Sequence, residues 1–304
     1  MGRYETNLIK LNKLMALAES DQAKLVKMSE ANYVKAITKA ANKITRNIAR
    51  KRIVLVTGPS ASGKTTTSNI LLAKLKERGI RSVVISMDNF FIDREKTPKL
   101  EDGSYDYENI TAIDVDHFKN CIDKLLIEGR AIFPIYDFAS GIRNDNGMEI
   151  VMDSSSVLIV EGIHAFNPAI VSKTMQGKFF RLYVCVNSGF VDEEHLVSAK
   201  QLRFTRRLVR DFLNRGASVE QTEEMWANVL RGENIFIKPY KKDADIVINT
   251  THPYEIFLYE EELKEIAKKD FNALKYVKMF DTGVEFDKSC ISEDALVWEF
   301  LSDK

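Results

Sequence analysis

The chain has 304 residues, with 44 basic and 44 acidic side chains and no formal net charge. Its composition, 45% hydrophobic and 29% charged, is typical of a soluble globular protein and excludes a disordered one. No apolar run approaches the ~18 residues of a membrane span, and the start MGRYETNLIKLNK lacks the apolar core of a signal peptide. The balanced charge gives no global reason to bind nucleic acid or a membrane. The three cysteines form no CxxC pair, so we expect a cytoplasmic enzyme or binding protein without disulfides or structural zinc.

Residues 1–50 have the spacing of two helices. One apolar side chain per turn recurs on a single face of each helix, namely Leu8, Leu11, Met15 and Ala18, then Val34, Ile37, Ala41, Ile44 and Ile48. We expect a helical N-terminal extension of two antiparallel helices that packs on the following domain. The alternative is an independent module.

From residue 51 to 270 the pattern changes to strands that alternate with helices. The first strand, 53–56, is a short apolar run typical of a strand buried on both faces. The two helices that come next in the chain end at Gly79 and Gly129. Further strands are expected at 82–86, 131–135, 157–160, 179–186 and 245–249. This alternation predicts an α/β domain with a parallel sheet covered on both faces, and with ligands at the carboxyl ends of the strands.

Two local signals add detail to this domain, and a tail follows it. Asn146-Gly147 predicts a hairpin turn. Ser218 with Gln221 three residues later predicts a capping box that opens a helix. The C-terminal tail, 271–304, has a weak pattern in which only 294–301 indicates a short helix.

Residues 58–65, GPSASGKT, match the phosphate-binding pattern GxxxxGK[ST] at every fixed position. The glycines let the backbone wrap so that N–H groups and the start of the next helix point at phosphate oxygens. Lys64 is expected to reach the β- and γ-phosphates, and the Thr65 hydroxyl to ligate Mg²⁺. We therefore predict a P-loop that binds a nucleotide through Gly58, Ser60, Ala61, Ser62, Gly63, Lys64, Thr65 and Thr66.

Two acidic residues stand at strand ends, where phosphoryl transfer needs them. Asp88 follows the second strand and is expected to accept the proton of the acceptor hydroxyl and to help hold the hydrated metal. Glu161 ends the strand 157–160 and fits a carboxylate on the metal side. For each residue the alternative is a cap in a turn. The guanine-reading NKxD motif is absent, which weighs against a GTPase.

Arginines recur at helical spacing in the run RFTRRLVRD, which starts at Arg203 and is followed by Arg215. Beside a P-loop, such a helix would neutralise charge on the transferring phosphoryl group. From the cluster alone, a solvated charged face is an equally good interpretation.

These motifs resemble, in kind and in order, those of uridine kinases and the wider phosphoribulokinase/uridine kinase group. The resemblance rests on the P-loop, MDNFF, DGSYDYENITAID, PIYDFASGIR, VLIVEGIHAFNP, RRLVRDFLNRG and KPYKKDADIVIN. The detail is similar to a branch of nucleoside kinases that carries DREKTP, EGIHALNP and a W–R-G-E segment. Here those segments are 93–98, 161–168, and Trp226 followed by 231–233. The resemblance covers about residues 30–260.

The resemblance implies ATP- and Mg²⁺-dependent phosphorylation of a nucleoside 5′-hydroxyl, with uridine and cytidine as leading substrates. It makes Asp88 the general base, Lys64 a phosphate residue, and Thr65 and Glu161 metal residues. Arg207 and Arg210 resemble the lid arginines, with Arg215 a third, and Glu108 takes the place of an aspartate that holds the ribose hydroxyls. The substrate side thus comprises Asp88, Phe91, Tyr107, Glu108, Tyr136, Phe138, Arg207 and Arg215.

The residues that read the pyrimidine depart from the uridine kinase pattern. Ala139-Ser140-Gly141 replaces a histidine, and Ala217 and Met225 replace an arginine and a glutamine. A kinase for another small hydroxyl substrate, such as a sugar phosphate, therefore stays open. A non-catalytic nucleotide-binding protein also stays open, although the retained P-loop and acids argue against it. The expected partner is a small-molecule substrate, and we expect binding to neither nucleic acid nor a membrane. The sequence determines neither the nucleobase nor the oligomeric state, and a homo-oligomer stays open.

Three other features are expected to be structural. His164 is expected to be packed or capping rather than a base contact, and Cys185 to be in the core. Asp102 and Asp106 are expected to lie in a solvated loop, with a flap that closes over substrate as the alternative.

Overall fold

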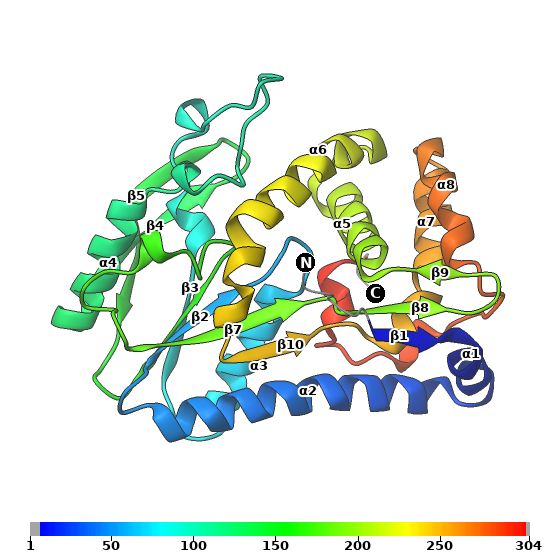
Figure 1. Ribbon diagram of the computed structural model, residues 1–304, viewed down its shortest axis with the longest axis horizontal. Coiled ribbons are helices and arrows are strands. Elements are labelled where there is room, and N and C mark those ends of the chain that lie inside the picture. Colours follow the sequence, from blue (N-terminus) through cyan, green and yellow to red (C-terminus); the bar gives the residue numbers. More distant parts are fainter. Residues whose placement is uncertain (1–6, 302–304) are drawn as a thin grey trace.

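A five-stranded parallel sheet forms the centre of the computed structural model, which describes residues 7–301 (Figure 1). The strand order is β10-β7-β2-β6-β3. The strands are β2 (Ile53–Thr57), β3 (Ser82–Ser86), β6 (Val157–Glu161), β7 (Phe179–Cys185) and β10 (Ile246–Asn249). Every residue of β2 and β6 is buried, which explains their continuous apolar sequences. The predicted parallel sheet is confirmed.

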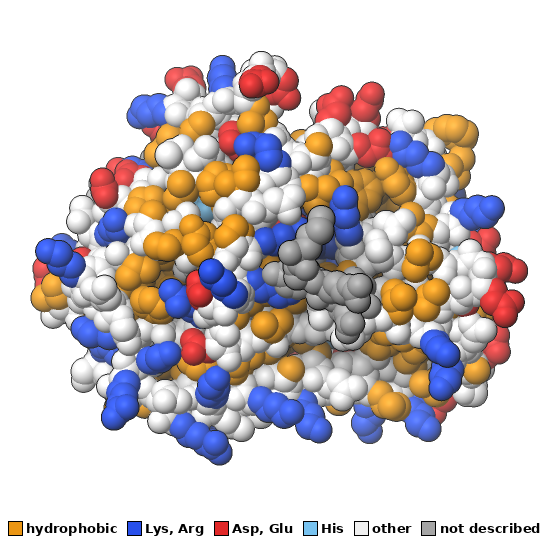
Figure 2. All heavy atoms as spheres, in the orientation of Figure 1, with side chains coloured by type: hydrophobic (Ala, Val, Ile, Leu, Met, Phe, Trp, Pro, Cys, Tyr) orange, Lys and Arg blue, Asp and Glu red, His pale blue; other side chains and the backbone are white. Residues whose placement is uncertain are grey.

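Helices cover both faces of this sheet, as predicted. Helices α2 (Gln22–Asn47) and α3 (Lys64–Lys76) pack on one face, where Ile37 and Leu71 join the apolar side chains of the strands. Helix α4 (Val115–Glu128) packs on the other face through Phe118 and Ile122. The outer side of α2 is basic, and Figure 2 shows Lys and Arg side chains along it.

A second group of helices packs around a separate apolar cluster at one end of the sheet (Figure 1). It comprises α1 (Leu11–Ser20), α5 (Ala199–Arg215), α6 (Val219–Gly232), α7 (Tyr259–Ala267) and the short α8 (Leu274–Val277). Helix α6 begins with the predicted capping box of Ser218 and Gln221. None of the described helices has the length and apolarity that crossing a bilayer requires.

From residue 7 onward, the N-terminal extension consists of a short strand followed by two helices. Asn7–Lys10 forms strand β1, which pairs in parallel with β8 (Ser188–Val191), and β8 pairs with β9 (Leu196–Val197). The predicted helix is therefore wrong at its start, because the edge of β8 supplies backbone partners to this segment. Leu8 is 51% exposed there instead of facing a core. Residues 1–6 lie outside the described residues.

The two helices of the extension differ in length, and α1 lies at one end of α2 (Figure 1). Asp21 joins them and caps α2 by accepting a hydrogen bond from the backbone N–H of Lys24. Helix α2 also contacts the P-loop helix directly, since the Tyr33 hydroxyl lies 2.7 Å from Thr67 Oγ1. The extension is thus packed on the α/β domain.

The predicted strand at 131–135 belongs to a separate hairpin, β4 (Arg130–Asp137) with β5 (Ile142–Val151). Its turn spans 138–141, so the turn predicted at Asn146-Gly147 is wrong. Gly147 lies inside β5, opposite an irregularity in β4 between Phe133 and Ile135. A Cβ at Gly147 would come within 2.7 Å of the Phe133 carbonyl oxygen, so the glycine serves a close approach at a bulge.

The C-terminal tail has little regular structure beyond α8 and returns to the sheet. In the segment predicted as a short helix, only Leu296–Glu299 is helical, as a 3₁₀ turn. Leu296 and Phe300 are buried in the apolar cluster that α2 and α3 form with the sheet.

Candidate active site

The P-loop joins the carboxyl end of β2 to the start of α3. Its backbone is left-handed at Ala61, with φ of 56°, and at Gly63, with φ of 82°. A Cβ at Gly58 would lie only 2.0 Å from the carbonyl oxygen of Val184 in β7, so no larger residue fits there. This tight path places the start of α3 at the carboxyl ends of the strands. The first N–H groups of α3, which have no partner inside the helix, can bind an anionic ligand there.

Thr65, in the first turn of α3, and Glu161, at the end of β6, are brought together. The Thr65 hydroxyl donates to Glu161 Oε1 at 3.3 Å and lies 3.4 Å from Oε2. Burial raises the pKa of Glu161 to about 7, against the lowering effect of Lys64. Asp88 and Glu299 raise that pKa further through their negative charge. A desolvated carboxylate of this kind is stabilised by a cation.

The oxygen donors at this point suit Mg²⁺. Among the described residues there is no group of three or more His, Cys, Asp and Glu side chains that would hold a metal alone. Mg²⁺ usually binds one or two protein oxygens together with waters and substrate phosphates. The Thr65 hydroxyl and the Glu161 carboxylate beside a P-loop fit that requirement.

Asp88 lies in a 3₁₀ turn, Met87–Phe90, directly after β3. The cap of this turn is Ser86, whose hydroxyl accepts from the Asp88 N–H, so the alternative of a capping Asp88 does not hold. Burial raises the pKa of the Asp88 carboxyl, while Lys64, Arg215 and Arg210 lower it through their charge. The carboxylate is therefore within electrostatic reach of the P-loop lysine and of two predicted lid arginines.

The predicted lid arginines converge on one acid, Asp211. Arg207 Nε lies 3.1 Å from Asp211 Oδ2, while Arg210 Nη2 and Arg215 Nη1 lie 2.8 and 3.4 Å from Oδ1. Arg207 Nη1 also donates to Ser60 Oγ of the P-loop at 2.8 Å. Arg207 and Asp211 are buried, so the solvated-face interpretation of this part of α5 is wrong. The sequence pattern did not reveal the role of Asp211, because an acid inside an arginine run also fits a surface helix.

A second buried network anchors α5 to the P-loop. Arg206 is fully buried, and its Nε donates to Glu255 Oε2 at 2.7 Å. Its Nη1 donates to Thr250 Oγ1 at 3.1 Å, and Thr250 donates in turn to the Ser62 carbonyl at 2.8 Å. No local signal marks these partners, because they lie more than 40 residues from Arg206 in the chain.

The predicted aromatic residues form one cluster next to Asp88. The Phe91 ring centroid lies 5.6 Å from those of Tyr107 and Tyr136 and 6.3 Å from that of Phe138. Phe91 and Tyr136 are buried, whereas Phe138 is 60% exposed at the turn of the β4-β5 hairpin. Such a cluster offers faces and edges on which a planar ring can pack.

Glu108 lies between this cluster and the P-loop. Burial raises its pKa to about 7, against the charges of Arg207 and Lys64. The space beside it requires a glycine, since a Cβ at Gly232 would lie 2.4 Å from Glu108 Cβ. The adjacent Asp106 is buried and accepts from Arg231 Nη2 at 2.8 Å. The prediction of a solvated loop is therefore wrong for Asp106, because α6 covers it.

The raised pKa of Glu108 predicts a pH-dependent effect on stability. An ordinary glutamate has a pKa near 4.5, whereas Glu108 in the folded protein has a pKa of about 7. Between these two pH values the unfolded chain releases the proton more readily than the folded protein, so the free energy of unfolding falls as pH rises. The stabilisation that neutral Glu108 gives to the folded protein is fully present below pH ~4.5 and is lost as pH rises through ~7. We expect Glu108→Gln, which resembles the neutral acid, to gain a few degrees in melting temperature over the native protein at pH 8 but not at pH 4.5. Thermal unfolding at both pH values measures this, and an equal difference at both would contradict it.

Three of the positions that depart from the uridine kinase pattern, Ala139, Ser140 and Met225, are exposed. Ser140 Oγ donates to Asp137 Oδ2 at 2.7 Å within the hairpin turn, and Met225 is 49% exposed on α6.

His164 is buried and its ring centroid lies 5.6 Å from that of Phe236. Burial lowers its pKa to about 4, so His164 is a packed, neutral ring, as expected. Cys185 is likewise in the core.

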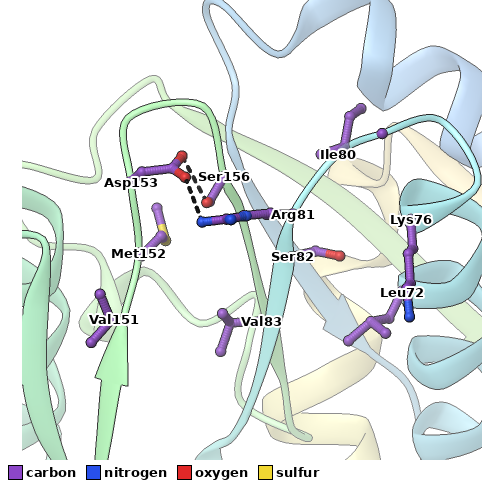
Figure 3. A pocket seen from close by; sticks show the side chains of 11 residues that line it. Leu72, Lys76, Ile80, Arg81, Ser82, Val83, Val151, Met152, Asp153 and Ser156 are labelled. Carbon is purple, nitrogen blue, oxygen red and sulfur yellow. Dashed lines mark hydrogen bonds and ion pairs between the residues drawn. The ribbon is translucent and has the colours of Figure 1, made fainter.

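A cavity of about 530 Å³ lies at the other end of the sheet (Figure 3). It is lined by side chains at the amino ends of β3 and β6, among them Arg81, whose Nη1 lies 3.6 Å from Asp153 Oδ2. Asp153 also accepts from Ser156. The cavity contains none of the predicted site residues, which gather at the carboxyl ends of the strands.

Comparisons with known proteins show the family of this chain. Residues 53–256 match the model of the phosphoribulokinase/uridine kinase family. A uridine kinase of Leuconostoc citreum is 28% identical over 197 residues, which are 64% of this chain and 86% of that protein. One of Chloroflexus aurantiacus is 30% identical over 196 residues, 64% of this chain and 85% of that protein. The solved structure of a possible uridine kinase from Bacillus stearothermophilus aligns with a TM-score of 0.47 and 21% identity, over 71% of this chain and 98% of that one.

The family match spans the sheet, the P-loop, both acids and the arginine helix. The chain therefore belongs to the phosphoribulokinase/uridine kinase family and is a uridine kinase-like P-loop phosphotransferase with a hydroxyl acceptor.

Proposed function

We propose that this chain transfers the γ-phosphoryl group of ATP, with Mg²⁺, to the 5′-hydroxyl of a nucleoside, uridine or cytidine first. One observation carries the proposal: the paired Thr65 and Glu161, the half-buried Asp88 and the arginines held by Asp211 gather beside one aromatic cluster. The relatives that are named uridine kinases support the choice of a nucleoside.

In this proposal, Asp88 accepts the proton of the 5′-hydroxyl as the O5′–Pγ bond forms and the bond from Pγ to the bridging oxygen of ADP breaks. Lys64, Arg207 and Arg210 stabilise the charge on the transferring group. Thr65 and Glu161 would hold Mg²⁺, which when bound neutralises the β- and γ-phosphate oxygens. Burial raises the pKa of the Asp88 carboxyl, and the positive charges of Lys64, Arg215 and Arg210 oppose that rise.

On the acceptor side, Glu108 accepts hydrogen bonds from the ribose hydroxyls, and Phe91, Tyr107, Tyr136 and Phe138 pack against the base. Apolar packing recognises a planar ring but reads few of its polar edges. We therefore expect a broader choice of base than in an enzyme that binds one base through hydrogen bonds.

A second candidate substrate is another small hydroxyl compound, such as a sugar phosphate. The hairpin turn favours it, because Ala139, Ser140 and Gly141 present no base-reading side chain and the Ser140 hydroxyl is already bonded to Asp137. In that case the arginines of α5 would bind the phosphate of the acceptor as well.

A panel of acceptors tests the proposal. Uridine, cytidine, purine nucleosides and sugar phosphates are each offered with Mg²⁺ and ATP, and the release of ADP is followed together with the mass and position of the new phosphate. We expect a nucleoside 5′-monophosphate as the main product, with uridine or cytidine preferred. Turnover of sugar phosphates alone would favour the second candidate, and no turnover with any hydroxyl acceptor would contradict both.

A further inference from the structure

The C-terminal tail reaches the phosphate-binding end of α3. Glu299 Oε2 accepts from the backbone N–H of Thr66 at 3.3 Å and from the Thr66 hydroxyl at 2.5 Å. Thr66 is the third residue of α3, so its N–H is one of those without a partner inside the helix. In a P-loop these N–H groups bind phosphate oxygens. A carboxylate from the far end of the chain therefore occupies a donor pair that a nucleotide would use.

The tail is fixed firmly enough to hold the carboxylate in place. Leu296 packs over the P-loop, since a Cβ at Gly63 would lie 2.5 Å from Leu296 Cδ1. Phe300 is fully buried, and the guanidinium carbon of Arg206 lies 4.9 Å from its ring centroid. Glu299 thus sits between two anchored apolar residues, and its position follows from their packing.

Ordinary capping does not account for this contact. The N-cap of α3 is Gly63, which has no side chain, and a helix is normally capped by a residue adjacent to it in sequence. Glu299 instead comes from 233 residues away and adds a negative charge beside Glu161. Two acids and a phosphate chain would repel one another at this point, since all carry negative charge.

We propose that Glu299 is an intramolecular competitor for the nucleotide phosphates at Thr66, and that nucleotide binding displaces the tail segment 296–301. This inference rests on the proposed function of the P-loop. It makes the tail a regulatory element, because any event that holds the segment away from α3 raises nucleotide affinity. The affinity of the native chain is accordingly below what its P-loop alone provides.

Calorimetric titration with Mg·ADP and Mg·ATP tests the competition. Glu299→Gln keeps the shape of the side chain but removes its charge, so we expect both nucleotides to bind about tenfold more tightly. Asp294→Asn is the matched control: it removes one charge from an exposed residue of the same tail, and its affinity is expected to equal that of the native chain. A Glu299→Gln affinity equal to or weaker than the native one would overturn the inference and leave the P-loop assignment intact. Absence of nucleotide binding in all three proteins would instead overturn both.

Hydrogen exchange tests the displacement itself. On saturation with ADP we expect faster amide exchange within 296–301, whose backbone bonds include that from the Phe300 N–H to the Val297 carbonyl. Slower or unchanged exchange in this segment, with ADP bound, would show that the tail stays in place and would overturn the proposal.

Discussion

Replacing Asp88 by Asn is expected to lower kcat by a factor of about 10² to 10⁴, the usual contribution of a positioned general base. Asparagine keeps the size of the side chain but cannot take the proton of the acceptor hydroxyl. ATP affinity should change little, because the P-loop contacts do not depend on this proton. Steady-state release of ADP measures kcat, and calorimetry with Mg·ATP measures the affinity.

Asp116→Asn supplies the control, since Asp116 is an exposed acid in the first turn of α4. It loses the same charge away from the site, so its kcat should equal that of the native chain. If Asp88→Asn kept full turnover while binding nucleotide, Asp88 would not be the base. A fall confined to ATP affinity would place the residue with the metal and not with the acceptor.

The fold followed from the sequence where local pattern and burial agree. The central strands β2 and β6 are apolar runs because both of their faces are covered, and such runs stand out from the helices between them. The P-loop could also be predicted from local sequence, because its backbone path requires glycine at fixed positions and few sequences allow that path. Local pattern did not reveal which strand pairs with which. As a result, the segment 7–10 was predicted as helix and the strand at 131–135 was not assigned to a hairpin.

The missed parts of the site depend on contacts between distant segments. Asp211 holds three arginines, but its role depends on how α5 is turned toward the P-loop. Glu255 and Thr250 follow β10 in the chain, and they contact Arg206 because β10 pairs with β7 in the sheet. Glu299 lies in a tail without periodicity, so nothing in its neighbourhood pointed to α3. Short motifs therefore predicted the candidate site residues, whereas the buried partners of those residues could be identified only from the tertiary structure.

Replacing Lys64 by Ala is expected to weaken ATP binding and to lower turnover together. The charge of Lys64 lowers the pKa of Asp88, Glu108 and Glu161 alike, so it balances three acids of the site that are buried or half-buried. Its loss removes the cation for the β- and γ-phosphates and also leaves those acids to repel the nucleotide. We expect kcat/KM for ATP to fall by a factor of about 10² to 10³, similar to the loss of one preorganised donor to a developing charge.

Lys76→Ala is the matched control, because Lys76 is exposed at the opposite end of the same helix and its removal costs an equal charge. Its kcat/KM should stay at the native value, and circular dichroism of both variants should show that α3 is intact. Parallel losses in Lys64→Ala and Lys76→Ala would mean that overall charge, and not a specific phosphate contact, sets the affinity. Native turnover in Lys64→Ala would contradict the phosphate role of this lysine, whose Nζ lies within the loop, 3.3 Å from the Pro59 carbonyl oxygen.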